Sequence, residues 1–296
     1  MHLGEVARQL PARTAVVLED RRVSYAALDA ASRRIAKLAR NYGLVRGSVL
    51  AVLAPNGPEF LAAVTAAQRS GLYALPLSTR STAADLRYLL SDSGTELLML
   101  DEELCGLVDA AQLGREGCAV VGFDEISGLF DTNNVPSEPD PVEGGDMLYT
   151  SGTTGKPKGV RKPLSFLPLG TETGRSKRLQ SLFDFDSDSV FLSPAPLYHA
   201  APLRFATTLL RLGATLILMR KFTAQKALTL LAEEKVTHSQ WVPTMFRRLL
   251  DCEPAPRAAI AAPAHRCAIH AGAPCPVGLK QEMITWWGPI LHEYYS

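Results

Sequence analysis

The sequence of 296 residues has little that would suit an exported or nucleic-acid-binding protein. Its five cysteines are odd in number and form no CxxC pair, so we expect free thiols in a reducing compartment. The 31 Lys and Arg residues nearly balance the 30 Asp and Glu residues. A formal net charge of +1 offers no clustered basic charge, and we therefore expect no nucleic-acid partner.

Long apolar runs are also missing. The longest, residues 49–55 and 214–219, are far shorter than the roughly 20 residues that span a bilayer. The amino terminus has no basic head followed by an apolar stretch, as an export signal would. The sequence predicts no membrane span and a cytoplasmic location.

What is present is an alternation of strand and helix patterns. Apolar residues fall at helical spacing over residues 24–42, and residues 49–53 form a short apolar run typical of a buried strand. Pro58 opens a further helix, and the alternation continues to about residue 121 and again after residue 190. This pattern predicts an α/β fold with a parallel sheet wrapped by helices.

The composition changes between residues 127 and 146. This stretch is rich in Gly, Pro, Asn and acidic residues, which is typical of a linker or a long surface loop. We expect it to divide the chain.

The stretch with the most chemical information follows that loop. Residues 149–159 read YTSGTTGKPKG, directly after a short apolar strand. Glycines let backbone N–H groups approach an anion, hydroxyls donate hydrogen bonds and lysines add positive charge, so the composition suits polyphosphate. The spacing excludes a Walker A loop, because only two residues separate Gly152 from Gly155 and Pro157 follows the first lysine. A flexible, solvated hairpin is the alternative.

These residues closely resemble the phosphate-loop signature of the adenylate-forming (AMP-binding) superfamily, in its acyl-CoA synthetase and fatty-acid–CoA ligase branch. The resemblance extends along the chain, to its amino-terminal portion only. It includes YAALD at 25–29, LAPNGPEF at 53–60, DLRYLL at 85–90, PLYHAA at 196–201, AGAP at 271–274 and EYYS at 293–296.

The resemblance implies a fold of two layered, parallel-rich sheets with flanking helices, as in the amino-terminal domain of that superfamily. The whole chain, 1–296, would be part of this domain, with one subdomain at about 46–170 and a second made of 1–45 and 171–296. The family's carboxyl-terminal lid domain has no counterpart in these residues, and we expect weak ATP binding and no thioester formation by this chain alone. We expect a chain extended by about 200 residues to be active.

The implied reaction is ATP-dependent activation of a hydrophobic carboxylic acid. The acid would attack the α-phosphate of Mg-ATP and release pyrophosphate, and a thiol would then displace AMP from the acyl-adenylate, giving a CoA thioester. The resemblance therefore implies ATP, Mg²⁺ and CoA. It assigns one set of residues to the phosphates: Thr150, Ser151, Gly152, Thr153, Thr154, Gly155 and Lys158, the last also catalytic.

Further residues receive roles from the same resemblance. His199 matches the position beside the substrate carboxylate, although a loop histidine is the alternative. Gly272, Ala273 and Pro274 match the segment along the adenine, and Tyr295 matches the tyrosine that stacks on it. Residues 238–241, at the end of a predicted strand, are candidates for the acyl pocket.

Two other functions stay open. The acyl group could pass to the phosphopantetheine of a carrier protein instead of CoA, or the chain could be a non-catalytic nucleotide- or acyl-binding fragment. A metal site formed by His265, Cys267, His270 and Cys275 is disfavoured, because a strand over 267–271 would point His270 away from the first two. We expect no protein metal site. The identity of the acid and the oligomeric state stay open.

Overall fold

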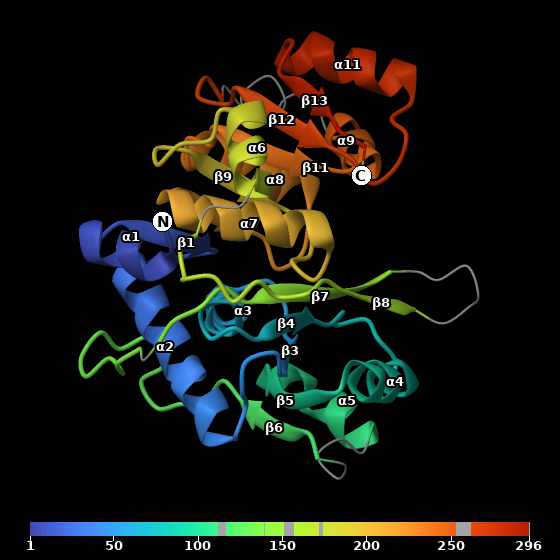
Figure 1. Cartoon of the computed structure of the whole chain (residues 1–296). Helices are drawn as coiled ribbons and strands as arrows, with labels where there is room; N and C mark the ends of the chain where they lie inside the picture. Colours follow the sequence, from blue (N-terminus) through green and yellow to red (C-terminus); the bar gives the residue numbers. More distant parts are fainter. Residues whose placement is uncertain (112–116, 139, 151–156, 172–173, 253–261, 296) are drawn as a thin grey trace. The chain divides into compact units, whose positions relative to one another are not determined.

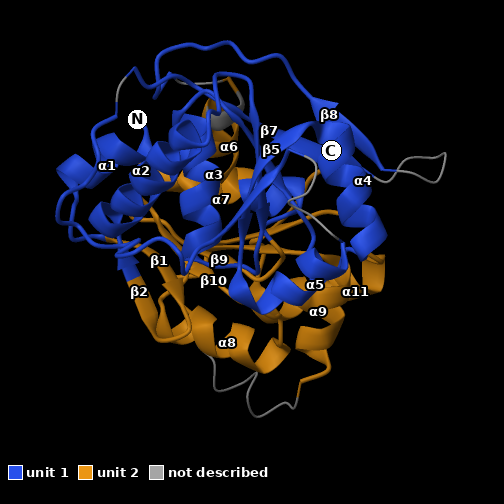
Figure 2. Cartoon of the chain, turned by 90° about the horizontal axis from the view of Figure 1, so that it is seen from below, with its two compact units in different colours: residues 1–13, 23–173, 197–203 blue, residues 14–22, 174–196, 204–296 orange. Residues whose placement is uncertain are grey.

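The computed structural model describes residues 1–111, 117–138, 140–150, 157–171, 174–252 and 262–295. These residues form two parallel-rich sheets with flanking helices (Figure 1), which confirms the predicted α/β class. The contacts divide the chain into two compact units (Figure 2). Unit 1 comprises residues 1–13, 23–173 and 197–203, and unit 2 comprises residues 14–22, 174–196 and 204–296.

Unit 1 contains a six-stranded sheet of order β6-β5-β3-β4-β7-β8. Its neighbouring strands run parallel, except that β8 is antiparallel to β7. The strands are β3 (Val49–Leu53), β4 (Tyr73–Pro76), β5 (Thr95–Leu100), β6 (Ala119–Gly122), β7 (Gly145–Thr150) and β8 (Lys158–Arg161).

Helices of unit 1 begin where the sequence supplies caps. Ser24 accepts from the N–H of Ala27 at the start of α2, and Thr82 and Asp85 form a capping box at the start of α4. Pro58 is the first residue of α3. The helices are α1 (Leu3–Gln9), α2 (Tyr25–Asn41), α3 (Pro58–Arg69), α4 (Ala83–Ser93), the 3₁₀ turn η1 (Glu102–Leu104) and α5 (Cys105–Ala110).

Unit 1 includes α1 and α2, which the predicted boundaries place in the second subdomain. The physical reason is that α2 packs along α3. It buries Leu28, Ala31 and Ile35 completely, so its apolar face is covered within unit 1.

The stretch at residues 127–146 does not act as a free linker. Arg34 of α2 donates hydrogen bonds to the carbonyl oxygens of Leu129, Asp131 and Asn133, and Arg69 of α3 pairs with Glu138. The described part of the stretch is therefore held against the helices of unit 1. Its composition predicted a loop, but the distant arginines that fix it are not visible in local composition.

Unit 2 is organised on a seven-stranded sheet of order β13-β12-β11-β9-β10-β1-β2. The pairs from β13 to β1 are parallel. Its strands are β1 (Thr14–Leu18), β2 (Arg21–Ser24, which crosses the unit boundary), β9 (Val190–Ser193), β10 (Thr215–Leu218), β11 (His238–Trp241), β12 (Cys267–His270) and β13 (Leu291–Glu293).

The core of unit 2 is rich in aromatic rings. Trp241 and Phe246 are fully buried, and the Trp287 ring lies 5.5 Å from that of Trp241, so Trp287 packs against this core. The helices are α6 (Gly174–Phe183), α7 (Ala200–Leu212, which begins in unit 1), α8 (Ala224–Glu233), α9 (Pro243–Leu250) and α11 (Val277–Trp287). Within the described ranges, no helix is both long and apolar enough to cross a membrane.

Candidate functional site

The predicted phosphate loop connects the two antiparallel strands at the edge of the unit 1 sheet. Thr150 is the last residue of β7 and pairs with Lys158, the first residue of β8. Both side chains are exposed, and directly opposed residues of an antiparallel pair project to the same face. The structure therefore brings Thr150 and Lys158 together. Ser151, Gly152, Thr153, Thr154 and Gly155 lie outside the described residues.

Helix α4 fixes the ends of this hairpin. The hydroxyl of Tyr88 donates to the carbonyl oxygen of Pro157 at 3.0 Å, and the hydroxyl of Tyr149 donates to the Asp92 carboxylate at 2.6 Å. Burial of Tyr149, together with this bond to Asp92, raises the pKa of its phenol, so the phenol keeps its donor proton.

The far end of β8 is held by another tyrosine, Tyr73. The Tyr73 hydroxyl donates to the carbonyl oxygen of Lys162 at 2.6 Å, and the guanidinium of Arg161 lies 4.3 Å from the centre of the Tyr73 ring. Arg161 also donates to the carbonyl oxygen of Gly47. Tyr73, Tyr88 and Asp92 were not predicted as functional residues, because their link to the hairpin depends on tertiary contacts.

His199 lies at the start of α7, in the short segment that belongs to unit 1. Its side chain is exposed, and its ring centre is 4.5 Å from that of Tyr198. Partial desolvation, with a smaller effect from Arg80, lowers the pKa of His199, which favours the neutral imidazole at pH 7. The preceding turn is positioned by Asn56, whose side-chain oxygen accepts from the N–H of Leu197 at 2.7 Å.

The candidate adenine residues lie in unit 2, where two adjacent parallel strands end. Gly272, Ala273 and Pro274 follow β12, and Tyr295 lies two residues after β13. The register pairs His270 with Glu293, so both segments leave the same edge of the sheet. Carboxyl ends of parallel strands are where α/β sheets bind ligands.

This edge has the features that a flat aromatic ligand needs. Gly272 adopts a φ of +87°, a left-handed conformation that favours glycine, and the residue is exposed to solvent. The Tyr295 side chain is fully exposed, whereas Tyr294 is half-buried against Phe205. The Tyr295 ring is therefore the more accessible of the two, and its role at the adenine stays a prediction.

Residues 238–241 belong to the packed core of unit 2. His238 bonds to the carbonyl oxygen of Phe183 at 3.0 Å, and Ser239 bonds to His265 at 2.7 Å. Trp241 donates its indole N–H to Ser239. These contacts account for the polar atoms of His238, Ser239 and Trp241 by core hydrogen bonding.

The described ranges contain no cluster of three His, Cys, Asp or Glu side chains that could hold a metal ion. Taken separately, the exposed Lys158 of unit 1 has the charge that suits a phosphate, and the exposed Tyr295 of unit 2 has a ring that suits stacking. A magnesium ion that enters with ATP takes many of its ligands from phosphates and water, so it does not require such a cluster.

Comparison with known proteins identifies the family. The sequence profile of the AMP-binding enzymes matches residues 3–296. This chain belongs to the AMP-binding enzyme family. It is 31% identical to the long-chain-fatty-acid–CoA ligase FadD13 of Mycobacterium tuberculosis over 268 residues, which cover 88% of this chain and 52% of FadD13.

Two further matches agree with this assignment. The fatty acid–[acyl-carrier-protein] ligase ScoC of Streptomyces coeruleorubidus is 30% identical over 249 residues, covering 82% of this chain and 48% of ScoC. The solved amino-terminal domain of FACL13 from Mycobacterium tuberculosis superposes with a TM-score of 0.83 and 27% identity, covering 99% of this chain and 74% of that domain. The chain spans about half the length of the curated relatives it matches. The family, its adenylate-forming ligase character and the fold are thereby established.

Proposed function

We propose that this chain carries the nucleotide and carboxylate sites of an acyl-CoA synthetase that activates a hydrophobic carboxylic acid. The observation that carries the proposal is the YTSGTTGKPKG segment, whose described ends, Thr150 and Lys158, face one another across the β7–β8 hairpin. Family membership and the names of relatives such as FadD13 support the same reaction class.

The chemical problem in this reaction is charge. A carboxylate must approach a polyanionic triphosphate, so cations and N–H donors have to stabilise the charge that moves onto the leaving pyrophosphate. We assign this role to Lys158, to the hydroxyl of Thr150 and to the loop residues between them. Mg²⁺, when it is bound with ATP, would neutralise phosphate charge further.

The remaining site residues have positioning roles in this proposal. The neutral imidazole of His199 lies beside the substrate carboxylate and orients it by hydrogen bonding. Gly272, Ala273 and Pro274 lie along the adenine, and Tyr295 stacks on it. The exposed ring of Tyr295 and the left-handed backbone at Gly272 support this assignment.

The acceptor is CoA in the proposed reaction. The alternative acceptor is the phosphopantetheine of a carrier protein, which is supported by the similarity to ScoC, a fatty acid–[acyl-carrier-protein] ligase. Both reactions share the adenylate step and differ only in the thiol that displaces AMP.

The test separates these steps. ATP–pyrophosphate exchange is measured with a panel of fatty and aromatic acids, and thioester formation is then measured with CoA and with a phosphopantetheinylated carrier protein. In a chain extended by about 200 residues, acid-dependent exchange followed by CoA thioester formation is the expected result, whereas the 296-residue chain alone should form no thioester. Thioester formation with the carrier alone would establish the alternative acceptor.

Nucleotide binding is measured separately from turnover. Calorimetric titration of the 296-residue chain with a non-hydrolysable acyl-adenylate analogue tests the nucleotide site directly. Binding that weakens in the Tyr295→Ala variant supports the assigned adenine site, and an unchanged affinity in that variant contradicts it.

A further inference from the structure

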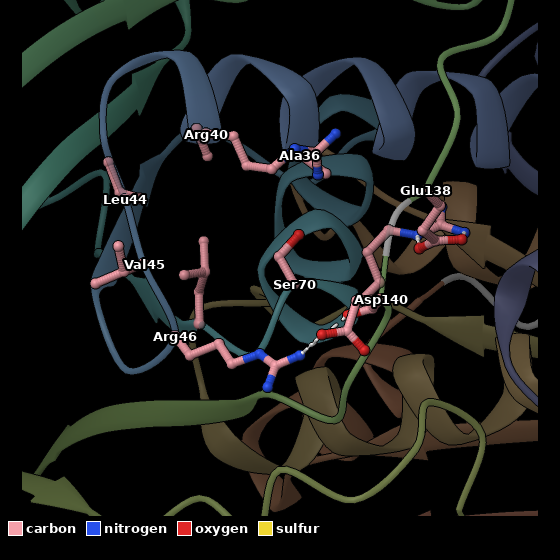
Figure 3. Close-up of a pocket in the computed structure, with 11 residues that line it drawn as sticks. Ala36, Arg40, Leu44, Val45, Arg46, Ser70, Glu138 and Asp140 are labelled. Carbon is pink, nitrogen blue, oxygen red and sulfur yellow. Dashed lines mark hydrogen bonds and ion pairs between the residues drawn. The ribbon is translucent and has the colours of Figure 1, made fainter.

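A cavity of about 450 Å³ lies in unit 1 (Figure 3). Three segments line it: residues 36–46 at the end of α2, residues 69–72 at the end of α3, and residues Glu138 and Asp140. These segments precede β3, β4 and β7, which are parallel and therefore begin at the same edge of the sheet. Thr150 is the last residue of β7, and a strand rises about 3.3 Å per residue. The cavity and Thr150 therefore lie at opposite ends of β7.

On one wall of the cavity the charged side chains are already paired with one another. Arg69 is only 4% exposed, and it pairs through separate nitrogens with the Glu138 carboxylate and with Asp29 and Ser32. Arg33 pairs with Asp29 at 2.8 Å and with Glu138 at 3.4 Å. Two arginines and two carboxylates thus neutralise one another, and this network leaves no charge for a ligand.

The opposite side of the cavity has unmatched donors. The side chain of Arg40, in the last turn of α2, is exposed, and it makes no hydrogen bond or ion pair with any other described residue. Figure 3 shows the Ser70 hydroxyl in the middle of the labelled residues, and no described residue accepts or donates a bond to it. Arg46 uses one nitrogen on Asp140 across the rim, in an exposed pair that is weakly held.

The floor of the cavity is apolar. Ala36, Ala39, Leu44 and Leu72 line it, and all four are buried. An apolar floor with a few polar groups at one side is the usual composition of a small-molecule site, and the volume lies in the usual range of about 300–1,000 Å³.

The charges of the lining residues restrict the ligand. Arg40, Arg46 and Arg69 against Glu138 and Asp140 leave one net positive charge. A cation would meet three arginines, and a polyanion such as a nucleotide would meet two carboxylates. The balance favours a single negative charge attached to an apolar group.

We propose that this cavity is a binding site for a small organic monoanion, such as a short-chain carboxylate, whose charged end contacts Arg40 and Ser70 and whose apolar end lies on Ala36, Ala39 and Leu72. This site is independent of the nucleotide site and of the acid that the proposed ligase reaction would consume.

The test is an NMR titration of the ¹⁵N-labelled 296-residue chain with hexanoate. Shifts in residues 36–46 and 69–72 are expected, with weaker binding of hexan-1-ol, which lacks the charge, and of adipate, which has a second one. Arg40→Gln should raise the Kd for hexanoate by about tenfold or more. Lys37→Gln, which removes an equally exposed cation one turn earlier on α2, should change the Kd by no more than about twofold.

A second variant keeps the test independent of the ligase reaction. Ser70→Phe fills the cavity and should abolish the shifts of residues 36–46, while binding of an acyl-adenylate analogue is retained. Equal effects of Arg40→Gln and Lys37→Gln, or hexanoate-induced shifts of residues 36–46 that persist in Ser70→Phe, would overturn the proposal. If the unsubstituted chain does not bind the acyl-adenylate analogue, the proposed function is contradicted, while the result for the cavity is unaffected.

Discussion

The hydroxyl of Tyr88 lies 3.0 Å from the carbonyl oxygen of Pro157, the residue directly before Lys158. Four residues later on the same helix, Asp92 accepts a hydrogen bond from Tyr149. Residues four apart lie on the same face of a helix, so one face of α4 holds both strands of the hairpin. The position of the Lys158 backbone is therefore fixed by a helix from another part of the sequence.

Tyr88→Phe removes the bond to Pro157 and leaves the ring in place. We expect pyrophosphate exchange to fall by about three- to tenfold, because one neutral hydrogen bond contributes about 1 kcal/mol. Tyr42→Phe is the control, because the Tyr42 side chain is half exposed at the end of α2. Equal exchange rates in the Tyr88→Phe variant and the unsubstituted protein would show that this bond does not position the hairpin for the reaction.

Lys158→Ala removes the cation at the end of the hairpin. Because the side chain is exposed, the free energy of unfolding should change by less than about 0.5 kcal/mol, whereas adenylate formation by the chain extended by about 200 residues should slow by at least about tenfold. Pyrophosphate exchange and urea unfolding are measured on the same preparation. Lys37→Ala serves as the charge-matched control, and unchanged exchange in Lys158→Ala would refute the phosphate role.

Gly144→Ala tests the close approach of the chain just before β7. An added Cβ would lie 2.3 Å from the carbonyl oxygen of Leu72 and 2.7 Å from that of Ala67. We expect the free energy of unfolding to fall by at least about 2 kcal/mol, since backbone atoms cannot move aside cheaply. Gly278→Ala, on the exposed side of α11 with open space around it, should change stability by no more than about 1 kcal/mol, in the stabilising direction.

The buried arginine network predicts a contrast between two similar substitutions. Arg69→Met leaves the carboxylates of Asp29 and Glu138 partly uncompensated, and we expect a loss of about 3–5 kcal/mol in urea unfolding. Arg46→Met removes an exposed pair with Asp140 and should cost less than about 1 kcal/mol. Comparable losses for the two variants would show that burial of the network does not stabilise unit 1.

Two buried histidines predict a pH dependence of stability. Burial lowers the pKa of both His238 and His265 from 6.5 to about 4. Between pH 4 and pH 6.5 the unfolded chain binds more protons than the folded chain. The contribution of the neutral histidines to the free energy of unfolding is therefore fully present above pH 6.5 and is lost as the pH decreases toward 4. The steepest slope for two such groups is about 2.7 kcal/mol per pH unit.

Urea unfolding at pH 7.5, 6.0 and 5.0 measures this slope. His238→Gln should reduce it by roughly half, because one of the two groups is removed. A slope that is unchanged in this variant would mean that His238 is protonated to the same extent in the folded and unfolded chains.

Local patterns in the sequence predict most of the fold, because caps and short apolar runs act over a few residues. Ser24 and Pro58 both begin helices where the sequence predicts them. The contacts that hold residues 127–146, such as that of Arg34 with Leu129, join residues far apart in the sequence, so no local pattern records them.

The candidate site divides in the same way. The strand and turn chemistry of the hairpin is visible in the composition of residues 149–159. The Tyr88 and Asp92 supports and the difference in burial between Tyr294 and Tyr295 come from contacts across the fold, so the sequence alone could not reveal them. The assigned roles of His199 and of residues 272–274 stay predictions.

Strand β8 is the outermost strand of the six-stranded sheet, and all four of its residues are exposed. Such a border strand has unpaired backbone groups that can recruit a strand from another molecule. Lys158, Arg161 and Lys162 place positive charge along this border, and Pro163 follows with no N–H to donate. The same cations that suit the hairpin to phosphate therefore also discourage self-association through this edge, so neutralising them together should promote aggregation.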